Sequence, residues 1–386
     1  MKPLLLVTNG HGEVAIANRI AAEIHRLRPD VGLDHLGLVA SAPASDMRDV
    51  GPRKAMPSGG LIAMGNLRNI ARDVAAGLFA LTVAQVRFLR SIRGRYAAAV
   101  AIGDVFALLM TLTARVPTVF VGTAKSVWVA PYGPLEERIL RHARARFVRD
   151  QATAARLLGH GLPAHAANVI ADLLDGVDDA RAEEAIAGFS PVVAILPGSR
   201  EKAYDDAIFL LRVVRELGRN DDGLGAILSV APNLSAEQFG RRCRDDGWDV
   251  QTGGLDVVPF VLRSGGRTLV RAWSGALGPI VRRVDLVFGQ AGTANEAAAA
   301  GGIAVVAFEP KRDRKSRWYR RRQSGLLGEA LLVLPNEVPE ALAGTRALLD
   351  DPLRRARMGA VGRERIGAAG AARVIAERVI AIAGDA

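Results

Sequence analysis

The sequence predicts two parallel, doubly wound α/β domains that face a cleft. Short apolar runs rich in β-branched residues alternate with helix-length segments along the whole chain, which is typical of βαβ units. The alternation breaks once, in a polar stretch after Asp172, and restarts in a second half of similar length. With 386 residues, 49% of them hydrophobic, the chain can form two cores, which excludes disorder as its main state.

The first half begins with a strand at 4–8, a glycine-containing turn at 10–12 and a helical segment at 13–27. Later strands are expected at 97–102, 118–122 and 146–149, with helices between them. The alternation makes this half Rossmann-like, because parallel strands need helical crossovers.

The second half repeats the pattern after a charged linker at 175–179. It starts with a strand at 192–196, a turn, and a helix at 205–217. The later strands are expected at 226–230, 249–252, 267–272, 285–289, 303–308 and 330–334. We therefore predict an N-terminal Rossmann-like domain at 1–175 and a C-terminal one at 190–350. Helices at 351–386 follow, and they could pack back on the N-terminal domain.

Charge and cysteine content narrow the classes of partner. Lys and Arg outnumber Asp and Glu by 51 to 40, so the chain is attracted to nucleic acid, anionic membranes or phosphorylated substrates. Nucleic acid is not expected, because no recognised binding module is readable and aromatic residues are 5%. The single cysteine, Cys243, excludes an internal disulfide and a cysteine-rich metal site. We expect neither a secretory signal nor a membrane-spanning helix.

Two features of the first half are candidate catalytic groups. The loop Asn9-Gly10-His11-Gly12-Glu13 follows a strand and opens a helix, where open α/β sheets bind ligands, so His11 and Glu13 could face a substrate. The alternative is a tight turn with a capping glutamate. Asp104 also follows a strand, and it is either a helix cap or a base whose pKa is raised by apolar surroundings.

The second half carries two candidate phosphate-binding turns. Gly198-Ser199-Arg200 follows the strand at 192–196; Ser199 could cap the next helix, and Arg200 could form a forked pair with a phosphate. Gly292-Thr293-Ala294 opens a later helix and offers N–H groups and a hydroxyl to a diphosphate. Glu296, one turn on, could accept two ribose hydroxyls, or simply complement the helix dipole.

Two further segments could contact an anionic surface. Residues 311–322 include eight basic residues with Trp318 and Tyr319 among them, which suits a lipid surface, a substrate phosphate or a solvated helix face. Residues 59–88 hold an apolar helix at 75–86 with arginines on both sides, which suits a membrane interface or an ordinary core helix.

Together these segments resemble the GT-B glycosyltransferases. More narrowly, they resemble lipid-A-disaccharide synthase and a related bacterial family without an assigned function. The resemblance runs from about residue 3 to 335. It is carried by the segments at 9–13, 102–105, 122–126, 132–136, 148–150, 196–200 and 292–297. Leu196-Pro197-Gly198-Ser199-Arg200 and Gly292-Thr293-Ala294-Asn295-Glu296 are fairly specific as a pair.

The resemblance implies a role for each matched residue. Gly198, Ser199, Arg200, Gly292, Thr293 and Ala294 would bind the diphosphate of a nucleotide-sugar, Glu296 the ribose and Gln323 the sugar. Asp104 lies near the aspartate proposed as catalytic in lipid-A-disaccharide synthase. His11 lies near a loop histidine of the enzyme that completes the peptidoglycan lipid precursor. The first loop has His11-Gly12-Glu13 where lipid-A-disaccharide synthase has Ser-Gly-Asp, so we do not carry over its lipid A acceptor.

The predicted function is therefore an inverting, metal-independent glycosyltransferase. It would move a sugar from a nucleotide-diphosphate donor, UDP-linked by resemblance, to a lipid or other membrane-associated acceptor, without a further cofactor. Asp104, Glu13 or His11 would be the base. The enzyme would lie at the inner face of the cytoplasmic membrane, attracted by anionic lipids. Two alternatives stay open: a nucleotide-sugar epimerase or hydrolase with this fold, and a non-catalytic protein that binds an anionic surface.

Overall fold

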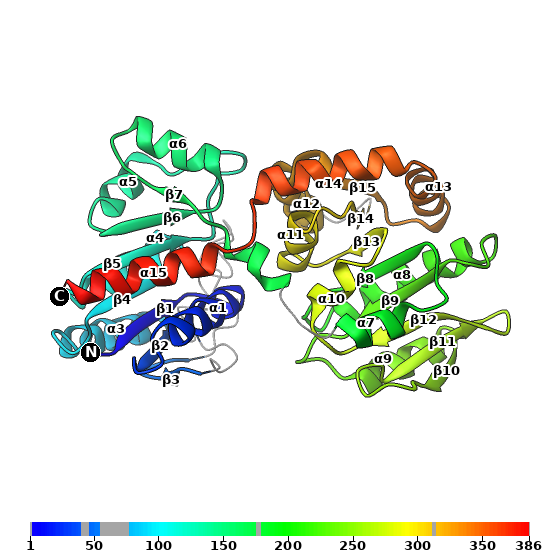
Figure 1. Ribbon diagram of the computed structural model, residues 1–386, viewed down its shortest axis with the longest axis horizontal. Helices are drawn as coiled ribbons and strands as arrows, with labels where there is room; N and C mark the ends of the chain where they lie inside the picture. The colour runs from blue at the N-terminus through cyan, green and yellow to red at the C-terminus, as the bar shows by residue number, and fades with distance from the viewer. Residues whose placement is uncertain (1, 40–45, 55–76, 175–178, 311–313, 386) are drawn as a thin grey trace. The chain divides into compact units, whose positions relative to one another are not determined.

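The computed structural model contains two compact units, each with its own sheet. It describes residues 2–39, 46–54, 77–174, 179–310 and 314–385 (Figure 1). The first unit comprises Met1–Asp172 together with Ala369–Ala386, and the second comprises Leu173–Ala368. The chain therefore passes between the units twice.

The first unit is built on a parallel sheet of seven strands in the order β3-β2-β1-β4-β5-β6-β7. The strands are β1 (Leu4–Thr8), β2 (Leu33–Gly37), β3 (Arg48–Asp49), β4 (Ala98–Gly103), β5 (Thr118–Gly122), β6 (Ala145–Val148) and β7 (His165–Ala166). Every residue of β1, β2, β4 and β5 is buried, as expected when helices cover both faces of a parallel sheet.

Helices cover the sheet of the first unit, and the last of them comes from the end of the chain. They are α1 (His11–Leu27), α3 (Leu78–Ser91), α4 (Val105–Leu112), α5 (Pro134–Leu140), α6 (Gln151–Gly159) and α15 (Ala371–Gly384). Figure 1 shows α15, in red, running beside the blue helix α1. The buried carboxylate of Asp172 accepts hydrogen bonds from the backbone N–H groups of Gly370 and, at 2.7 Å, Ala372. It therefore anchors the start of α15.

The strands β2 and β3 were not predicted, and their residues explain why. Asp34 and His35 of β2 are polar, yet both are buried. Asp34 accepts from Tyr96 at 2.7 Å, and its carboxylate pairs with Arg48 of β3. His35 lies between Thr8 and Asp49, at 2.8 Å from each. These contacts satisfy the polar groups and hold the short edge strand, so a strand forms without an apolar pattern.

The second unit holds an eight-stranded sheet in the order β10-β11-β12-β9-β8-β13-β14-β15. The strands are β8 (Val192–Leu196), β9 (Gly225–Ser229), β10 (Asp249–Thr252), β11 (Phe260–Ser264), β12 (Arg267–Trp273), β13 (Leu286–Gly289), β14 (Val305–Glu309) and β15 (Leu331–Pro335). Its helices are α7 (Asp179–Ile186), α8 (Ala203–Gly218), α9 (Ala236–Asp245), α10 (Leu277–Val281), α11 (Thr293–Ala300), α12 (Arg314–Leu327), α13 (Val338–Leu349) and α14 (Pro352–Ile366).

One edge of this sheet is not parallel, contrary to the purely parallel pattern predicted. The strand β11 was missed, and it pairs antiparallel with both β10 and β12. A two-residue turn, Gly265-Gly266, joins β11 to β12, and both glycines have positive φ (60° and 80°). A two-residue hairpin turn of type I′ requires positive φ at both of its central residues. The Gly-Gly pair in the sequence therefore indicated a hairpin.

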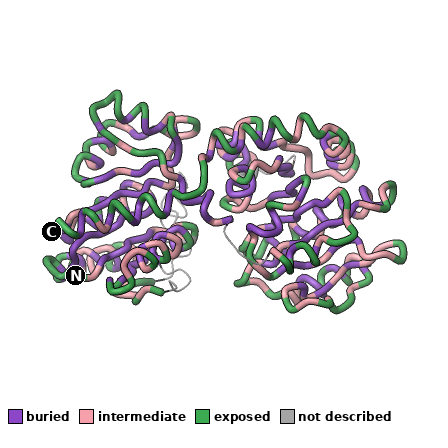
Figure 2. Tube along the Cα trace, in the orientation of Figure 1, coloured by how far each residue is buried: buried purple, intermediate pink, exposed green. Residues whose placement is uncertain are grey.

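The C-terminal helices divide between the two units. Helix α14 packs against α11 in the second unit, whereas α15 packs against α1 in the first. The strands of both units are largely buried, and the outer faces of the helices are exposed (Figure 2). Residues 351–386 therefore do not form one body.

Candidate functional site

Both sheets have a topological switch point, and the candidate loops lie at them. The strand order reverses between β1 and β4 in the first unit and between β8 and β13 in the second. Ligands of open α/β sheets bind outside the carboxyl ends of the strands at such points. The four predicted motifs follow these four strands: 9–13 after β1, Asp104 after β4, 198–200 after β8, and 292–294 after β13.

Asp104 has both of the features that the sequence left as alternatives. It is the N-cap of α4, accepting from the backbone N–H of Ala107 at 3.1 Å. Its Oδ1 also accepts from Asn9 Nδ2 at 2.7 Å. Burial raises the pKa of Asp104 above its usual value, although these hydrogen bonds oppose the shift. A carboxylate that is partly desolvated in this way is a better proton acceptor than an exposed one.

Glu13 belongs to the same group of loops in the first unit. Its Oε1 accepts from Thr123 Oγ1 at 3.1 Å, and the backbone N–H of Thr123 donates to the carbonyl of Gly103 at 2.9 Å. The residues that follow β1, β4 and β5 therefore lie together, with two carboxylates among them. His11 opens α1, but its side chain lies outside the described residues.

In the second unit, the loop after β13 leads into the N-terminus of α11. Thr293 begins the helix and is exposed, and the N–H groups of a first helical turn have no partner within the helix. Glu296 lies in that turn and is 8% exposed. The positive end of the helix dipole and a nearly buried carboxylate thus lie within one turn.

The loop after β8 lies beside this helix start. The backbone N–H groups of Gln290 and Ala291 both donate to the carbonyl of Leu196, the last residue of β8, at 2.9 and 3.3 Å. Arg200 is exposed, as a residue that binds a solvent-borne anion should be. Ser199 does not cap the next helix, contrary to our prediction: α8 begins at Ala203 after Lys202 and has no side-chain cap, because 200–202 form an intervening turn.

The basic run contributes Arg320, which the sequence did not single out, and the helix that carries it also holds Gln323, for which the resemblance implies a sugar contact. The side chains of 311–316 lie outside the described residues, while on the described part of α12 Arg320 and Gln323 point inward and are 6% and 3% exposed. Tyr319 Oη lies where a side chain on Gly292 would be, so a larger residue at 292 would require the Tyr319 side chain to move. Burial raises the pKa of Tyr319, Glu296 adds to the shift, and Arg320 and Arg200 oppose it.

Arg320 and Gln290 were therefore missed, and Gln323 was named only as a sugar contact that the resemblance implies. The readable signal was the spacing Arg320, Gln323, Leu327, which places three residues on one face of a helix. All three are buried, so the run is neither wholly solvated nor wholly available to an external surface.

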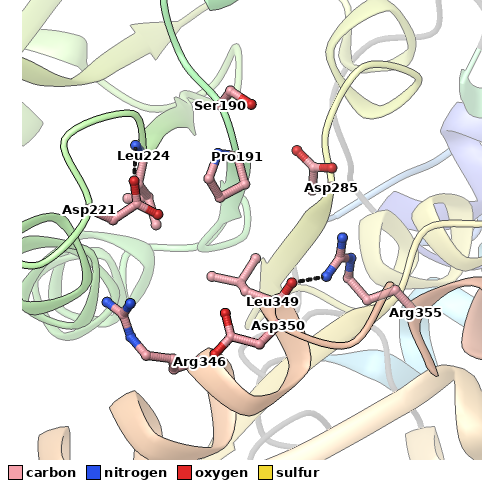
Figure 3. Close-up of a pocket in the computed structure, with 9 residues that line it drawn as sticks. All are labelled: Ser190, Pro191, Asp221, Leu224, Asp285, Arg346, Leu349, Asp350 and Arg355. Atoms are coloured by element: carbon pink, nitrogen blue, oxygen red, sulfur yellow. Dashed lines mark hydrogen bonds between the residues drawn. The ribbon is translucent and has the colours of Figure 1, made fainter. Parts of the chain in front are cut away.

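A cavity of about 290 Å³ in the second unit lies at the amino ends of the central strands, opposite the ends that carry the predicted loops (Figure 3). Ser190, Pro191 and Asp285 line it just before β8 and β13 begin. Its carboxylates and arginines mostly bond to nearby backbone: Asp285 accepts from Val192, and Arg355 donates to the carbonyl of Leu349. This cavity is therefore remote from the predicted binding loops.

Comparison with known proteins identifies the fold. No protein-family model and no curated protein matches the sequence. Many solved structures are similar, among them the following three, which match nearly the whole chain. A protein from Listeria monocytogenes, provisionally assigned as a UDP-N-acetylglucosamine 2-epimerase, has a TM-score of 0.60 and 13% identity, covering 100% of this chain and 98% of that one. The UDP-GlcNAc 2-epimerase of Neisseria meningitidis, bound to UDP-GlcNAc, has a TM-score of 0.56 and 12% identity, covering 98% and 100%.

The third is MurG of Acinetobacter baumannii, with a TM-score of 0.58, 12% identity, and coverage of 99% and 100%. The chain has the GT-B fold. Two Rossmann-like sheets with helices on their faces, as predicted, account for the likeness. At these identities the likeness confirms the predicted GT-B fold, and the activity has to be argued from the loops.

Proposed function

We propose that this GT-B protein is an enzyme that binds a UDP-sugar in its second unit and transfers the sugar to a membrane-associated lipid acceptor with inversion. The observation that carries the proposal is the switch point between β8 and β13. It brings together the N-terminus of α11, the exposed Arg200 and the nearly buried Glu296. The similar structures from Listeria monocytogenes and Neisseria meningitidis, both named for UDP-N-acetylglucosamine, support a uridine diphosphate ligand.

The donor groups have separate roles in this proposal. The N–H groups at 292–294 and the Thr293 hydroxyl bind the diphosphate, and the loop at Gly198 and Ser199 lies against it. Arg200 offers a forked pair of N–H donors to its oxygens. Glu296 accepts the ribose hydroxyls. As the bond to the sugar breaks, charge builds on the departing diphosphate, and the helix dipole and Arg200 stabilise it, so a metal ion is not needed for that step.

The acceptor side belongs to the first unit. A base there takes the proton of the acceptor hydroxyl as its oxygen bonds to the anomeric carbon and the diphosphate leaves from the opposite face. Asp104 is the first candidate, because its pKa is raised and it is held by Asn9. Glu13 and His11 are the others.

A lipid acceptor is supported by the resemblance to lipid-A-disaccharide synthase and by the charge of the chain. In the described residues, no helix is long and apolar enough to span a bilayer. The excess of eleven positive charges favours docking on an anionic leaflet, at about 1 kcal/mol per Lys or Arg that faces the surface. We place the enzyme at the inner face of the cytoplasmic membrane. Flotation with anionic vesicles should recover more protein than flotation with neutral vesicles, and equal recovery would contradict the membrane proposal.

A second candidate is epimerisation of the UDP-sugar without an acceptor, since two of the similar structures are named as UDP-GlcNAc 2-epimerases. Incubation with UDP-GlcNAc, with and without a membrane extract, distinguishes an epimerase from a transferase. Formation of an epimeric UDP-sugar identifies an epimerase. Release of UDP only when a membrane extract supplies an acceptor identifies a transferase.

Donor binding is tested by thermal shift with UDP, GDP, ADP and TDP and their sugars. A ligand present at 100 times its dissociation constant raises the free energy of unfolding by about 2.7 kcal/mol. We expect a selective shift with the uridine series and a Kd for UDP raised about 10- to 100-fold in Glu296→Ala, the equivalent of a lost hydrogen bond to a charged group. Glu237→Ala, at an exposed glutamate of the same unit, is the matched control and should bind normally. A wild-type protein that binds no nucleotide would overturn the proposal.

A further inference from the structure

Arg320 is a buried cation whose hydrogen-bond partners are neutral amides. The residue is 6% exposed, and in the described part of the chain its guanidinium donates to the side-chain amide oxygens of Gln290 and, at 2.6 Å, Gln323. Among the described residues, the carboxylates of Asp206 and Glu309 act on its charge without a direct hydrogen bond. Burial lowers the pKa of Arg320, but the group remains charged at neutral pH. Burying a charge is costly unless other groups compensate it, so this arrangement calls for a reason.

The two glutamines that accept from Arg320 also donate hydrogen bonds to backbone carbonyls. Gln323 Nε2 donates to the carbonyls of Ala291 and Gly292 at 3.1 and 3.3 Å. Gln290 Nε2 donates to the carbonyl of Phe308 at 3.0 Å, at the end of the neighbouring strand β14. Both ends of the Gln323 amide are therefore engaged within the second unit.

A third amide completes the group. Asn295 is fully buried, and its Nδ2 donates to the carbonyl of Gly289 at 3.1 Å and, more weakly, to Gln323 Oε1 at 3.4 Å. The carbonyls of Gly289, Ala291 and Gly292 are thus all bound on the protein side. The side chains Arg320, Gln290, Gln323 and Asn295 are called the amide network below.

The amide network fixes the direction of two peptide N–H groups, together with the helical hydrogen bond from the N–H of Glu296 to the carbonyl of Gly292 at 3.2 Å. In a trans peptide the C=O and the N–H point in opposite directions. Holding the carbonyls of Ala291 and Gly292 therefore aims the N–H groups of Gly292 and Thr293 away from the amide network. The guanidinium also polarises the amides it contacts, which strengthens the hydrogen bonds further along the chain of donors.

We propose that Arg320 and Gln323 are positioning residues for anion binding: they hold the peptides at 291–293 so that their N–H groups face the phosphates of the ligand, and neither side chain contacts the ligand. The inference rests on the diphosphate site of the proposed function. It differs from the sugar contact that the resemblance implies for Gln323, because Gln323 is 3% exposed and its amide is already bonded at both ends.

Gln323→Glu tests the proposal. The glutamate still accepts from Arg320, so the fold should be kept, but it no longer donates to the two carbonyls and it neutralises the buried charge. We expect the Kd values for UDP, UDP-GlcNAc and inorganic pyrophosphate to rise by the same factor, at least tenfold, while uridine binds as before. Gln251→Glu makes the same change at an exposed residue of the same unit and should leave every Kd unchanged.

Three outcomes would overturn the inference. If only UDP-GlcNAc loses affinity, Gln323 contacts the sugar. If all probes including uridine lose affinity, the substitution acts by loosening the unit as a whole. If no probe loses affinity, the network does not position the loop. Should Gln323→Glu fail to fold, Arg320→Lys is measured in its place, since it keeps the charge but loses the forked geometry.

Amide hydrogen exchange gives a readout that needs no ligand. Loss of the donor at Gln323 should speed exchange in the peptide covering 289–300 and leave α14 unchanged. Unchanged exchange at 289–300 refutes the positioning role, even if the wild-type protein binds no nucleotide and the proposed function itself has failed.

Discussion

Replacing Asp104 with asparagine should separate the two roles that its carboxylate combines. Asparagine caps a helix about as well as aspartate does, so the hydrogen bond from Ala107 can be kept. The charge is lost, and with it the penalty that burial places on the ionised group. We therefore expect Asp104→Asn to fold as stably as the wild-type protein or more stably, but to lose turnover by about 10²- to 10⁴-fold, the usual contribution of a general base.

The sign of the pH dependence follows from the raised pKa of Asp104. A carboxyl group that binds its proton more tightly in the folded state stabilises the fold below its unfolded pKa of about 4, and this contribution is lost as the pH rises through the folded pKa. The advantage of Asp104→Asn should thus appear at pH 7 and disappear below about pH 4. Asp104→Ala, which also lacks the cap, should be less stable by about 1 kcal/mol, or about 2–4 °C in melting temperature.

Both quantities can be measured on the same samples. Melting followed by circular dichroism at pH 4 and pH 7 gives the stabilities, and UDP release from UDP-GlcNAc in the presence of a membrane extract gives turnover. Asp104→Asn melting as low as Asp104→Ala would refute the capping argument. Asp104→Asn retaining full turnover would show that the base is another group.

Two further predictions concern the stability of the first unit. Asp172→Ala removes the acceptor for the N–H groups that start α15. We therefore expect the free energy of unfolding to fall by about 1–2 kcal/mol and amide hydrogen exchange in α15 to become faster. Unchanged exchange would show that other contacts hold this helix. Burial pushes the pKa of Asp49 up, but hydrogen bonds from His35 and Arg53 outweigh it and leave the pKa lowered. Asp49→Asn should therefore be less stable than the wild type in urea at pH 7, and the difference should shrink as the pH falls through the lowered folded pKa; a difference in stability that does not change with pH would contradict this cause.

The sequence was sufficient for features that depend on apolar runs and glycine turns. The strands at the switch points are β1, β4, β8 and β13. Each is a buried apolar run followed by a polar loop, so the sequence predicted both the strand and the place where it ends. The same pattern predicted a helix at 294–300 after the Gly-Thr turn, and α11 begins one residue earlier, at Thr293. Features of this kind are local, which is why they could be predicted without the structure.

What could not be predicted depends on contacts between distant residues. The strand β2 is stable because Tyr96 and Arg48 satisfy Asp34, and neither partner is near it in the sequence. Arg320 looked like one more charge in a basic run, because composition does not show which face of a helix turns inward. Its partner Gln290 is thirty residues away and drew no attention.

The two switch points carry different sets of charged groups, and this difference supports separate roles for the two units in the proposed reaction. In the second unit the N-terminus of α11, Arg200 and Arg320 place positive charge around the β13 loop, with Glu296 as the carboxylate among them. In the first unit the groups that follow β1 and β4 are the carboxylates of Glu13 and Asp104. A departing diphosphate requires the first environment, and a base for an acceptor hydroxyl requires the second. Reversing the charge at Arg200 with Arg200→Glu should therefore weaken UDP binding, whereas Asp104→Asn should leave it intact. Equal losses of UDP affinity in the two variants would contradict the division.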